Sequence, residues 1–372
     1  MIPVSEPWIG EAEEKYLLDA FRSGWISSAG AYIDKFEREW ARHCGRKHGI
    51  SVSNGTTALE AAVAALELPV GSEIIVPSFT IISCAQAIIR NGLMPIYIDS
   101  DPKIWGMDVT KLESLVSSST RAIMVVHIYG HPVDMDVVLD VAKRRDLKII
   151  EDAAEVHGAR YKGRICGGFG DLSTFSFYAN KIICTGEGGM VVTDDDELAR
   201  RLRSYRNLCF REDRRFLHTE LGHNYRFTNL QAAIGLAQVE KIEQALKRKE
   251  WMGGLYNELL REVKDLELPP RTDWADNVYW VYGLVLGDSY PFDATALAES
   301  LKQKGIQTRP FFLGMHEQPA LKAFTSPGRT FPVTERLSRR GLYLPSGLTI
   351  TEDQVRASAD ALKAALRELS GR

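Results

Sequence analysis

Residues 173–190 read STFSFYANKIICTGEGGM and place one lysine, Lys181, in a glycine-bounded turn between two apolar runs. These runs, Leu172–Phe177 and Gly189–Thr193, have the composition of buried strands. Burial disfavours an ammonium, so this setting lowers the pKa of the lysine and favours the neutral amine that attacks an aldehyde. The alternative is a lysine whose stem crosses apolar surface while its head reaches water. For an isolated lysine this alternative is favoured, so a reactive amine is indicated only by the surrounding residues.

Short apolar runs recur upstream of this turn and alternate with helical patterns from about Asp34 onward. Such alternation is typical of βαβ units wound into a parallel sheet. We therefore predict an α/β fold whose large domain has a mostly parallel sheet flanked by helices. The other strands are expected at Gly49–Ser53, Glu73–Val76, Met94–Asp99, Arg121–His127 and Lys148–Glu151. The helices between them are expected at Thr57–Leu66, Cys84–Arg90 and Met135–Arg144.

The second half of the chain predicts a smaller α+β unit. A long helical pattern runs from beyond Thr228 to about Leu260 and leaves the first domain, with Gly235 and the Gly253-Gly254 pair as candidate kinks. A strand is then expected at Asn277–Leu286, and helices at Thr295–Lys304 and Glu352–Leu369. With 372 residues in all, we predict a large domain over residues 1–245 and a small C-terminal domain over residues 246–372.

The composition argues against several classes of protein. A formal net charge of -3 leaves no basic footprint for binding a nucleic-acid backbone. The five cysteines are scattered without a Cys-x-x-Cys pair, which argues against a disulfide framework or a zinc cage and fits a reducing cytoplasm. No stretch approaches the roughly 20 apolar residues of a membrane span, and residues 1–14 lack a signal-peptide pattern. We expect a soluble cytoplasmic protein that binds no nucleic acid, membrane or metal.

Two further groups of polar residues follow predicted strand ends. Asp152 comes directly after the strand Lys148–Glu151, where open α/β sheets place ligands, and an acid there keeps a pyridine nitrogen protonated. The stretch SNGTT, residues 53–57, opens an alanine-rich helix whose N-terminus can cradle a phosphate. Taken alone, Asp152 is better explained as a helix N-cap, and capping explains the turn at residues 53–57 as well as a phosphate cradle does. Together with Lys181 and the hydroxyl of Ser176, they would hold a phosphorylated pyridine aldehyde at three points.

Four motifs follow one another along the chain: EDAA at residues 151–154, FSF with NK within 175–181, TGEGGM at 185–190 and GHNYR at 222–226. On these motifs the sequence resembles the DegT/DnrJ/EryC1/StrS family, fold-type I aminotransferases that use pyridoxal phosphate and act on nucleotide-linked sugars. The resemblance extends over essentially the whole chain, from WISS at residues 25–28 to LPS at residues 344–346. It implies a fold-type I transferase with a large cofactor-binding domain.

The resemblance also implies roles at the cofactor, which alternates between pyridoxal phosphate and pyridoxamine phosphate. Lys181 would hold it in Schiff-base linkage and carry the proton during transfer, and Asp152 would pair with the pyridinium nitrogen. Asn224 would reach the phosphate from the neighbouring subunit, so a homodimer with shared active sites is implied. The other residues at the phosphate end would be Gly55, Thr56, Thr57 and Ser176.

Two cofactor positions depart from the commonest family pattern. Glu155 falls where many members carry Gln near the phenolic oxygen, and its carboxyl would bond that oxygen only by sharing a proton with it. The alternative for Glu155 is a surface helix glutamate. Ile81 falls where the family usually places an aromatic side chain on the pyridine ring, and it would pack there by dispersion alone. Phe79 is the other candidate for that contact.

The family resemblance further points to residues bordering the nucleotide-sugar site, among which Arg309 is the favoured partner for a diphosphate because an arginine fork bonds it at two points. Arg226 could instead be a structural ion-pair partner. His316 and His131 could be structural histidines, since a lysine already serves as base. The full set of substrate candidates is Trp25, Ser27, Tyr225, Arg226, Arg309, Phe311 and His316.

The implied reaction passes an amino group from glutamate to a nucleotide-linked keto sugar, with a GDP-linked 4-keto sugar favoured. Open alternatives are a dTDP- or UDP-linked keto sugar and an 8-keto octulosonate. A related dehydratase of the same keto sugar has histidine in place of the lysine, so Lys181 argues against that reaction. From another class, the chain could be a catalytically silent regulator that binds the cofactor or a nucleotide sugar.

Overall fold

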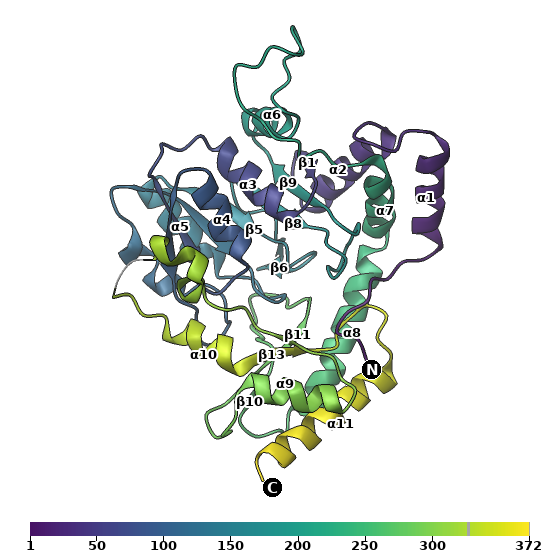
Figure 1. Cartoon of the computed structure of the whole chain (residues 1–372), viewed down its shortest axis with the longest axis vertical. Helices are drawn as coiled ribbons and strands as arrows, with labels where there is room; N and C mark the ends of the chain where they lie inside the picture. The colour runs from purple at the N-terminus through teal and green to yellow at the C-terminus, as the bar shows by residue number, and fades with distance from the viewer. Residues whose placement is uncertain (326–327, 372) are drawn as a thin grey trace.

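A computed structural model describes residues 1–325 and 328–371, and a large sheet lies at its centre (Figure 1). Within these residues the sheet has seven strands in the order β1-β9-β8-β5-β4-β2-β3. The strands are β1 His48–Val52, β2 Glu73–Pro77, β3 Met94–Ile98, β4 Thr120–Val126, β5 Lys148–Asp152, β8 Leu172–Ser176 and β9 Gly189–Thr193. Neighbouring strands from β3 to β8 are parallel, and β9 is antiparallel to both β8 and β1. The predicted strands are confirmed within one residue at either end.

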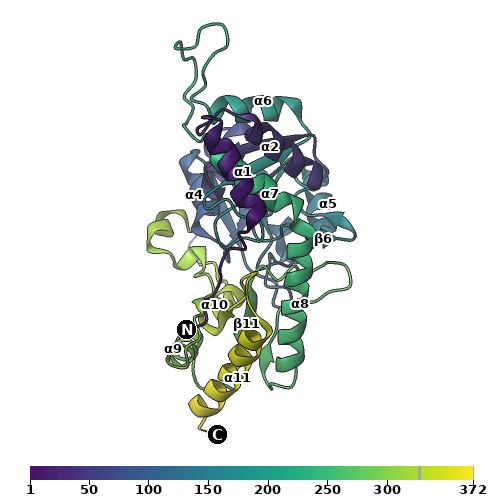
Figure 2. The same cartoon turned by 90° about the vertical axis from the view of Figure 1, so that its right-hand side faces the viewer.

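Helices flank the sheet, as predicted. Helices α3 and α4 pack on each other, and α3 also lies against β8 and β9. Figure 2 shows α4 and α5 on opposite sides of the sheet. Helices α1 and α2 pack on α7, Asn229–Glu240, beside the edge strand β1. The bounds are α1 Glu11–Arg22, α2 Ala31–His43, α3 Gly55–Ala65, α4 Ile82–Arg90, α5 Met135–Arg145 and α6 Asp196–Tyr205.

One edge of the sheet gathers the polar groups predicted to hold a cofactor. The parallel strands β5 and β8 end there at Asp152 and Ser176, and α3 begins there at Gly55. Successive residues of a strand point to opposite faces, so Asp152 and the preceding Glu151 face different helix layers. The alternation of the chain therefore brings distant motifs to one place.

The long helical pattern after Thr228 forms two helices, α7 Asn229–Glu240 and α8 Ile242–Leu260. The helical pattern is interrupted at Lys241, and both helices continue across the glycines at which kinks were predicted. Two of those glycines instead admit neighbouring rings. A Cβ at Gly235 would lie 2.8 Å from the Phe36 ring, and one at Gly253 would lie 2.5 Å from Cδ2 of Tyr279.

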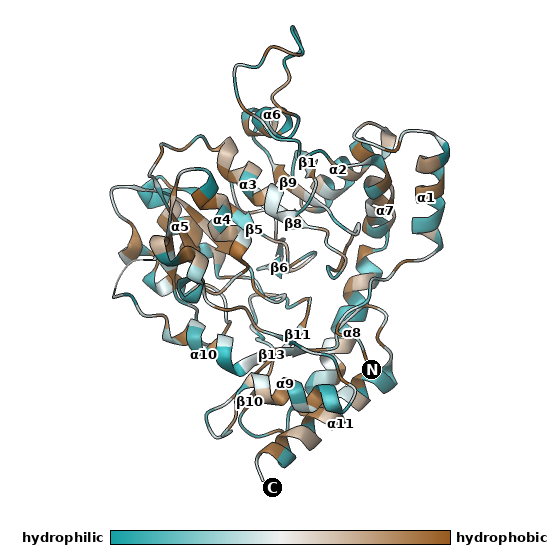
Figure 3. Cartoon of the chain, viewed as in Figure 1, coloured by the Kyte–Doolittle hydropathy of each residue, from teal (hydrophilic) through white to brown (hydrophobic). Residues whose placement is uncertain are grey.

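A second, smaller sheet follows α8 and has the order β10-β11-β13-β12, with all neighbours antiparallel. Its strands are β10 Leu266–Glu267, β11 Tyr282–Leu286, β12 Arg309–Pro310 and β13 Gly341–Leu344. The accompanying helices are α9 Ala294–Gln303, α10 Pro332–Arg340 and α11 Glu352–Leu369. Helix α11 shows both brown and teal bands in Figure 3, because its buried residues recur at helical spacing.

The predicted strand Asn277–Leu286 is only half present, since pairing begins at Tyr282. The side chain of Asn277 accepts a hydrogen bond from the backbone N–H of Tyr279 at 2.8 Å, and Tyr279 has a φ of 47°. A residue in that conformation cannot continue a strand. The segment 277–281 therefore leaves the sheet and lies against the turn that contains Gly130.

Buried apolar side chains form a large cluster around the central sheet and a smaller one that includes Met252, Tyr256, Leu284 and Leu362. The proposed boundary at residue 245 lies inside α8 and stays a prediction. In the part of the chain that the structure describes, no helix is long and apolar enough to cross a membrane. The remaining short elements are β6 Arg160–Tyr161, β7 Arg164–Ile165 and the 3-10 helices Val109–Lys111, Glu113–Leu115, Met315–Glu317 and Pro319–Phe324.

Candidate active site

Lys181 lies in the turn that joins β8 to β9, and its backbone N–H donates to the Tyr178 carbonyl at 2.8 Å. The side chain is 10% exposed, with Nζ 3.9 Å from Oε1 of Glu155. Burial lowers the pKa of this amine, while the carboxylates of Glu155 and Asp152 act in the opposite direction. The turn thus presents a buried amine whose proton is easily removed, which is what attack on an aldehyde requires.

Asp152 ends β5 and is also buried. Its Oδ1 accepts the backbone N–H of Ala154 at 3.1 Å, and its Oδ2 accepts the thiol of Cys84 at 3.4 Å. No helix begins in residues 153–158, so the carboxyl makes a local turn instead of a helix cap. Burial raises the pKa of Asp152, with the Ala154 N–H and Lys181 opposing it. A thiol is a weak donor, so this carboxylate retains capacity for a cationic partner.

Glu155 is buried three residues further on, so the alternative of a surface helix glutamate is wrong. Its Oε2 accepts the backbone N–H of Tyr129 at 2.8 Å. Burial raises the pKa of Glu155 to about 7, although the Lys181 ammonium acts to lower it. A carboxyl in that range can donate or accept a proton at neutral pH.

The N-terminus of α3 is the segment predicted to cradle a phosphate. Asn54 caps the helix by accepting the backbone N–H of Thr57 at 2.9 Å, and the Thr57 hydroxyl is turned back to the Asn54 carbonyl. Thr56 points instead to Ser83, with their hydroxyl oxygens 2.8 Å apart. A Cβ at Gly55 would lie 2.7 Å from Cβ of Ser176. The glycine therefore lets α3 approach β8, and exposed N–H groups remain at the helix end for a phosphate.

The residues present fit pyridoxal phosphate. They supply a reactive amine at Lys181, a carboxyl at Asp152 and an anion cradle at Gly55, all at one sheet edge. Two buried polar atoms nearby, Oγ1 of Thr174 and Oδ1 of Asn180, find no hydrogen-bond partner among the described residues. Thr174 lies opposite Asp152 in the register of β5 and β8. Orphaned polar atoms at such a place are expected where a polar ligand binds.

The two candidates for the ring-stacking position differ in exposure. Ile81 precedes α4 and is 43% exposed. Phe79 is fully buried, and its ring contacts Tyr129, Phe311 and Phe312. Phe79 is committed to this cluster, so Ile81 is the side chain free to meet a cofactor ring.

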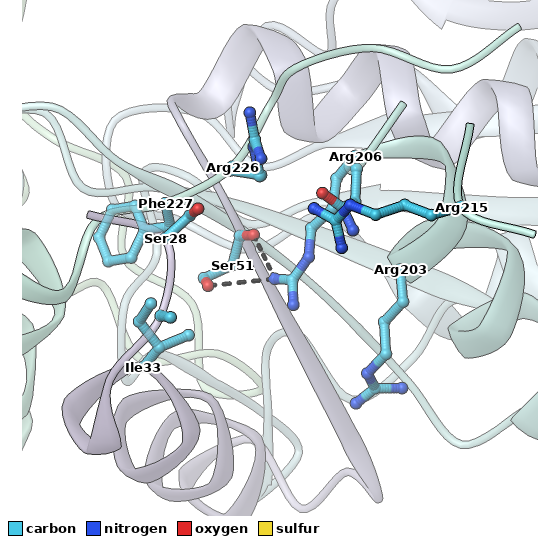
Figure 4. A pocket seen from close by; sticks show the side chains of 10 residues that line it. Ser28, Ile33, Ser51, Arg203, Arg206, Arg215, Arg226 and Phe227 are labelled. Carbon is cyan, nitrogen blue, oxygen red and sulfur yellow. Dashed lines mark hydrogen bonds between the residues drawn. The ribbon is translucent and has the colours of Figure 1, made fainter. Parts of the chain in front are cut away.

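A cavity of about 370 Å³ beside β1 contains one predicted substrate residue, Arg226 (Figure 4). Four arginines line it, of which Arg206 is already bonded to Glu37 at 2.5 Å and to the Ser51 carbonyl at 2.6 Å. Apart from Arg226, this arginine group is not apparent from the sequence, because its members are scattered over α6 and the segment after it. The arginines are Arg203, Arg206, Arg215 and Arg226.

Residues 224–226 lie at the surface of the single chain. Asn224 is exposed, and its Oδ1 accepts Nε of Arg226 at 2.8 Å. Arg226 thus contacts an amide in place of the ion-pair partner that was the alternative. Tyr225 turns inward, and its hydroxyl donates to Glu60 at 2.5 Å.

The other predicted substrate residues are dispersed. Trp25 is 61% exposed and the Ser27 carbonyl accepts the N–H of Asn229. Arg309 is exposed on β12, whereas Phe311 is buried beside Tyr129. Nδ1 of His316 lies 2.7 Å from the Ser78 hydroxyl, and its ring stacks on Phe331. His131 is held between the Pro132 carbonyl and the Thr272 hydroxyl. The roles of these substrate residues stay predictions.

A buried group of three potential metal ligands lies on the other face of β5: His127, Glu151 and Cys166. The Glu151 carboxylate already accepts backbone N–H groups of Gly167 and Phe169 and the Ser173 hydroxyl. The His127 contact at 3.1 Å, followed by these backbone donors, holds the pKa of Glu151 at about 2 against the effect of burial. The carboxylate of Glu151 is thus occupied by hydrogen bonds from the protein.

Comparison with known proteins places this site in a family. The model of the DegT/DnrJ/EryC1/StrS aminotransferase family matches residues 7–363. GDP-perosamine synthase of Caulobacter vibrioides is 40% identical, over 96% of this chain and 97% of that protein. GDP-perosamine synthase of Escherichia coli O157:H7 is 39% identical, over 95% of each.

Solved structures agree with this match. S. venezuelae DesV in complex with a ketimine intermediate is 31% identical, with a TM-score of 0.89 over 95% of this chain and 94% of that one. The aminotransferase TlmJ from Streptoalloteichus hindustanus has a TM-score of 0.93 at 28% identity, over 99% of this chain and 100% of that one. The chain therefore belongs to the DegT/DnrJ/EryC1/StrS aminotransferase family, whose members depend on pyridoxal phosphate.

Proposed function

We propose that this protein passes the amino group of glutamate to C4 of GDP-4-keto-6-deoxymannose and so forms GDP-perosamine. The observation that carries the proposal is similarity over nearly the whole chain to GDP-perosamine synthases of three bacteria, including 36% identity to that of Vibrio cholerae. Lys181, Asp152 and Glu155 form one buried site in this chain, as such chemistry requires.

When bound, pyridoxal phosphate supplies an aldehyde that accepts the amino group and a ring that withdraws electrons from the reacting carbon. Asp152 would pair with the ring nitrogen and help to keep it protonated, and Glu155 would share a proton with the phenolic oxygen. The amine of Lys181, once free, would carry the proton during the transfer. Because the site is buried, these charges act on one another with little screening by water.

We further propose a homodimer in which each subunit completes the other's site. Asn224 is exposed in the single subunit, and Arg226, which donates to it, is half-buried. The segment between α6 and α7 projects from the body in Figures 1 and 2 and carries Phe216 and Leu221, which are 82% and 92% exposed. Large apolar side chains at such exposure are typical of an interaction surface. A second copy of the chain is the proposed partner.

A second acceptor sugar is supported by a different relative. The dTDP-3-amino-3,4,6-trideoxy-alpha-D-glucose transaminase of Streptomyces venezuelae is 32% identical over 90% of this chain. An 8-keto octulosonate, a UDP-linked sugar and a silent regulatory role are tested by the same experiments. We propose that the product is a sugar donor for the synthesis of a surface polysaccharide such as an O-antigen, and that the enzyme acts in the cytoplasm.

The test follows the two half-reactions by visible absorbance. Glutamate added to cofactor-loaded protein should bleach the yellow band, and GDP-4-keto-6-deoxymannose added after removal of glutamate should restore it. A band that bleaches but returns only with a dTDP- or UDP-linked sugar would transfer the proposal to that acceptor. A protein that binds the cofactor and never bleaches with glutamate would contradict the proposed donor.

Lys181→Ala tests the catalytic assignment. Without the amine there is no group to carry the proton, so turnover should be abolished while the fold is kept. Lys143→Ala, which changes an exposed lysine on α5, is the matched control and should turn over normally. Normal turnover by Lys181→Ala would refute the role of Lys181.

A further inference from the structure

Trp280 contacts the reactive lysine in two ways. Its ring lies beneath the amine, with Nζ of Lys181 3.6 Å from the ring centroid. Its indole N–H donates to the carbonyl of Asn180, the residue before the lysine, at 2.8 Å. One side chain thus touches both the reactive amine and the peptide that carries it.

Trp280 is itself held from two sides. Its carbonyl accepts Nζ of Lys249, a buried lysine on α8, at 2.9 Å. Its ring stacks on Tyr129 at 6.2 Å between centroids, and the backbone N–H of Tyr129 is the group that donates to Glu155. The indole is 5% exposed, so it has little freedom to leave the amine.

The indole face stabilises the protonated amine of Lys181, which burial has removed from water. An ammonium taken out of water is stabilised by the negative face of an indole ring and by opposite charge. Trp280 supplies the first at 3.6 Å, and Glu155 supplies the second at 3.9 Å. The amine is therefore held between a π face and a carboxyl group that can exchange a proton.

We propose that Trp280 is a positioning residue that receives the amine of Lys181 whenever that amine is not bonded to another group, and keeps it aimed into the site. This inference rests on Lys181 being the amine released during amino transfer. The ring favours the protonated form that the lysine passes through, and the hydrogen bond to Asn180 fixes the direction of its stem.

The first experiment measures the acid dissociation constant of Lys181 in the cofactor-free protein. Acylation at Lys181 is followed against pH by peptide mass spectrometry. Tryptophan is replaced throughout by mono- and difluorotryptophan, which withdraw charge from the ring face and keep its shape. The constant should rise with each fluorine, by about two- to fivefold in all, because the ammonium loses attraction.

The matched control is the same incorporation in Trp280→Phe, where fluorination of the other tryptophans should leave Lys181 unchanged. Trp274→Leu removes an indole that packs on Tyr161 and His131, and it should keep the normal response to fluorine. No response in the wild-type chain, or an equal response in Trp280→Phe, would overturn the role of Trp280. The readout needs no cofactor or substrate, so failure of amino transfer in the absorbance test would be a separate result.

Discussion

Glu155 is costly to ionise in the folded protein, because burial raises its pKa to about 7 whereas an unfolded glutamate titrates near 4.3. Between these pH values the folded state binds more protons. The contribution of Glu155 to stability is thus complete below about pH 4 and is lost as the pH rises through about 7. In Glu155→Gln this loss is absent. Urea unfolding should show the variant gaining roughly 2–3 kcal/mol on the wild type between about pH 5 and pH 8.

Glu14→Gln changes an exposed glutamate of α1 and serves as the control, with no such trend. A difference between Glu155→Gln and the wild type that stays constant over this pH range would contradict the shifted titration.

The titration of Lys249 should change stability with pH in the opposite direction. Burial lowers its pKa to about 7, against about 10.4 in an unfolded chain, so the unfolded state binds more protons between these values. Stability should therefore rise with pH over that window, by up to about 1.4 kcal/mol per unit, and the rise should be missing in Lys249→Met. The variant is also expected to be less stable throughout, since the carbonyls of Trp280 and Ser346 lose their donor. The measurement is urea unfolding at several pH values.

The exposed neighbour Lys247→Met is the control and should keep the slope. An unchanged slope in Lys249→Met would show that this lysine does not titrate near neutral pH.

At the scale of the element, α8 offers a test in two adjacent glycines. A Cβ at Gly253 would meet the Tyr279 ring at 2.5 Å, whereas nothing lies within 4 Å of a Cβ at Gly254. Gly254→Ala should raise the unfolding free energy by about 0.5–1 kcal/mol through helix propensity. Gly253→Ala should lower it by about 1–3 kcal/mol through overpacking. Thermal unfolding of both variants measures these changes in stability. Equal shifts of the two midpoints would contradict the close approach of α8 to Tyr279.

The same region shows which structural features the spacing of apolar residues can predict. Apolar spacing predicted a helix across residues 229–260, and all but Lys241 are helical. The spacing did not reveal that Gly235 and Gly253 are contact points, because that depends on which ring lies opposite. Segment 277–281 is a second case in which contacts outside the local pattern decide the structure. Alternation predicted a strand, but the Asn277 side chain and the Gly130 carbonyl accept backbone N–H groups of this segment.

At the scale of the whole molecule, the proposed shared site predicts complementation between two inactive subunits. Lys181→Ala and Asn224→Ala homodimers should both be impaired. In a mixed dimer, one site carries both defects and the other carries neither, if Asn224 acts across the interface. Activity of the mixture, after subunit exchange, should exceed that of either parent. Light scattering or ultracentrifugation gives the subunit number.

The control is a mixture of Lys181→Ala with Asp152→Ala. Both residues lie in the same site of one chain, so every mixed dimer should stay impaired in both sites. If the mixture with Asn224→Ala gained nothing either, the shared site would be refuted.

Much of this protein is determined by local sequence. Apolar runs that alternate with helical patterns specify the central sheet to within a residue, because buried parallel strands need such runs and crossover connections, usually helices, between them. The motifs around Asp152, Gly55 and Lys181 fall at strand or helix ends, and parallel strands bring such ends to one edge. The cofactor chemistry could therefore be predicted before any contact was known.

The tertiary structure decided what depends on direction and distance. It buried Glu155 and faced it with Lys181, placed Phe79 in the core and left Ile81 open. It also brought Trp280, about a hundred residues further along the chain, beneath the reactive amine. Such pairings are set by packing between elements, and the interaction of charges depends on separation and on exclusion of water. Neither quantity is a property of the local sequence.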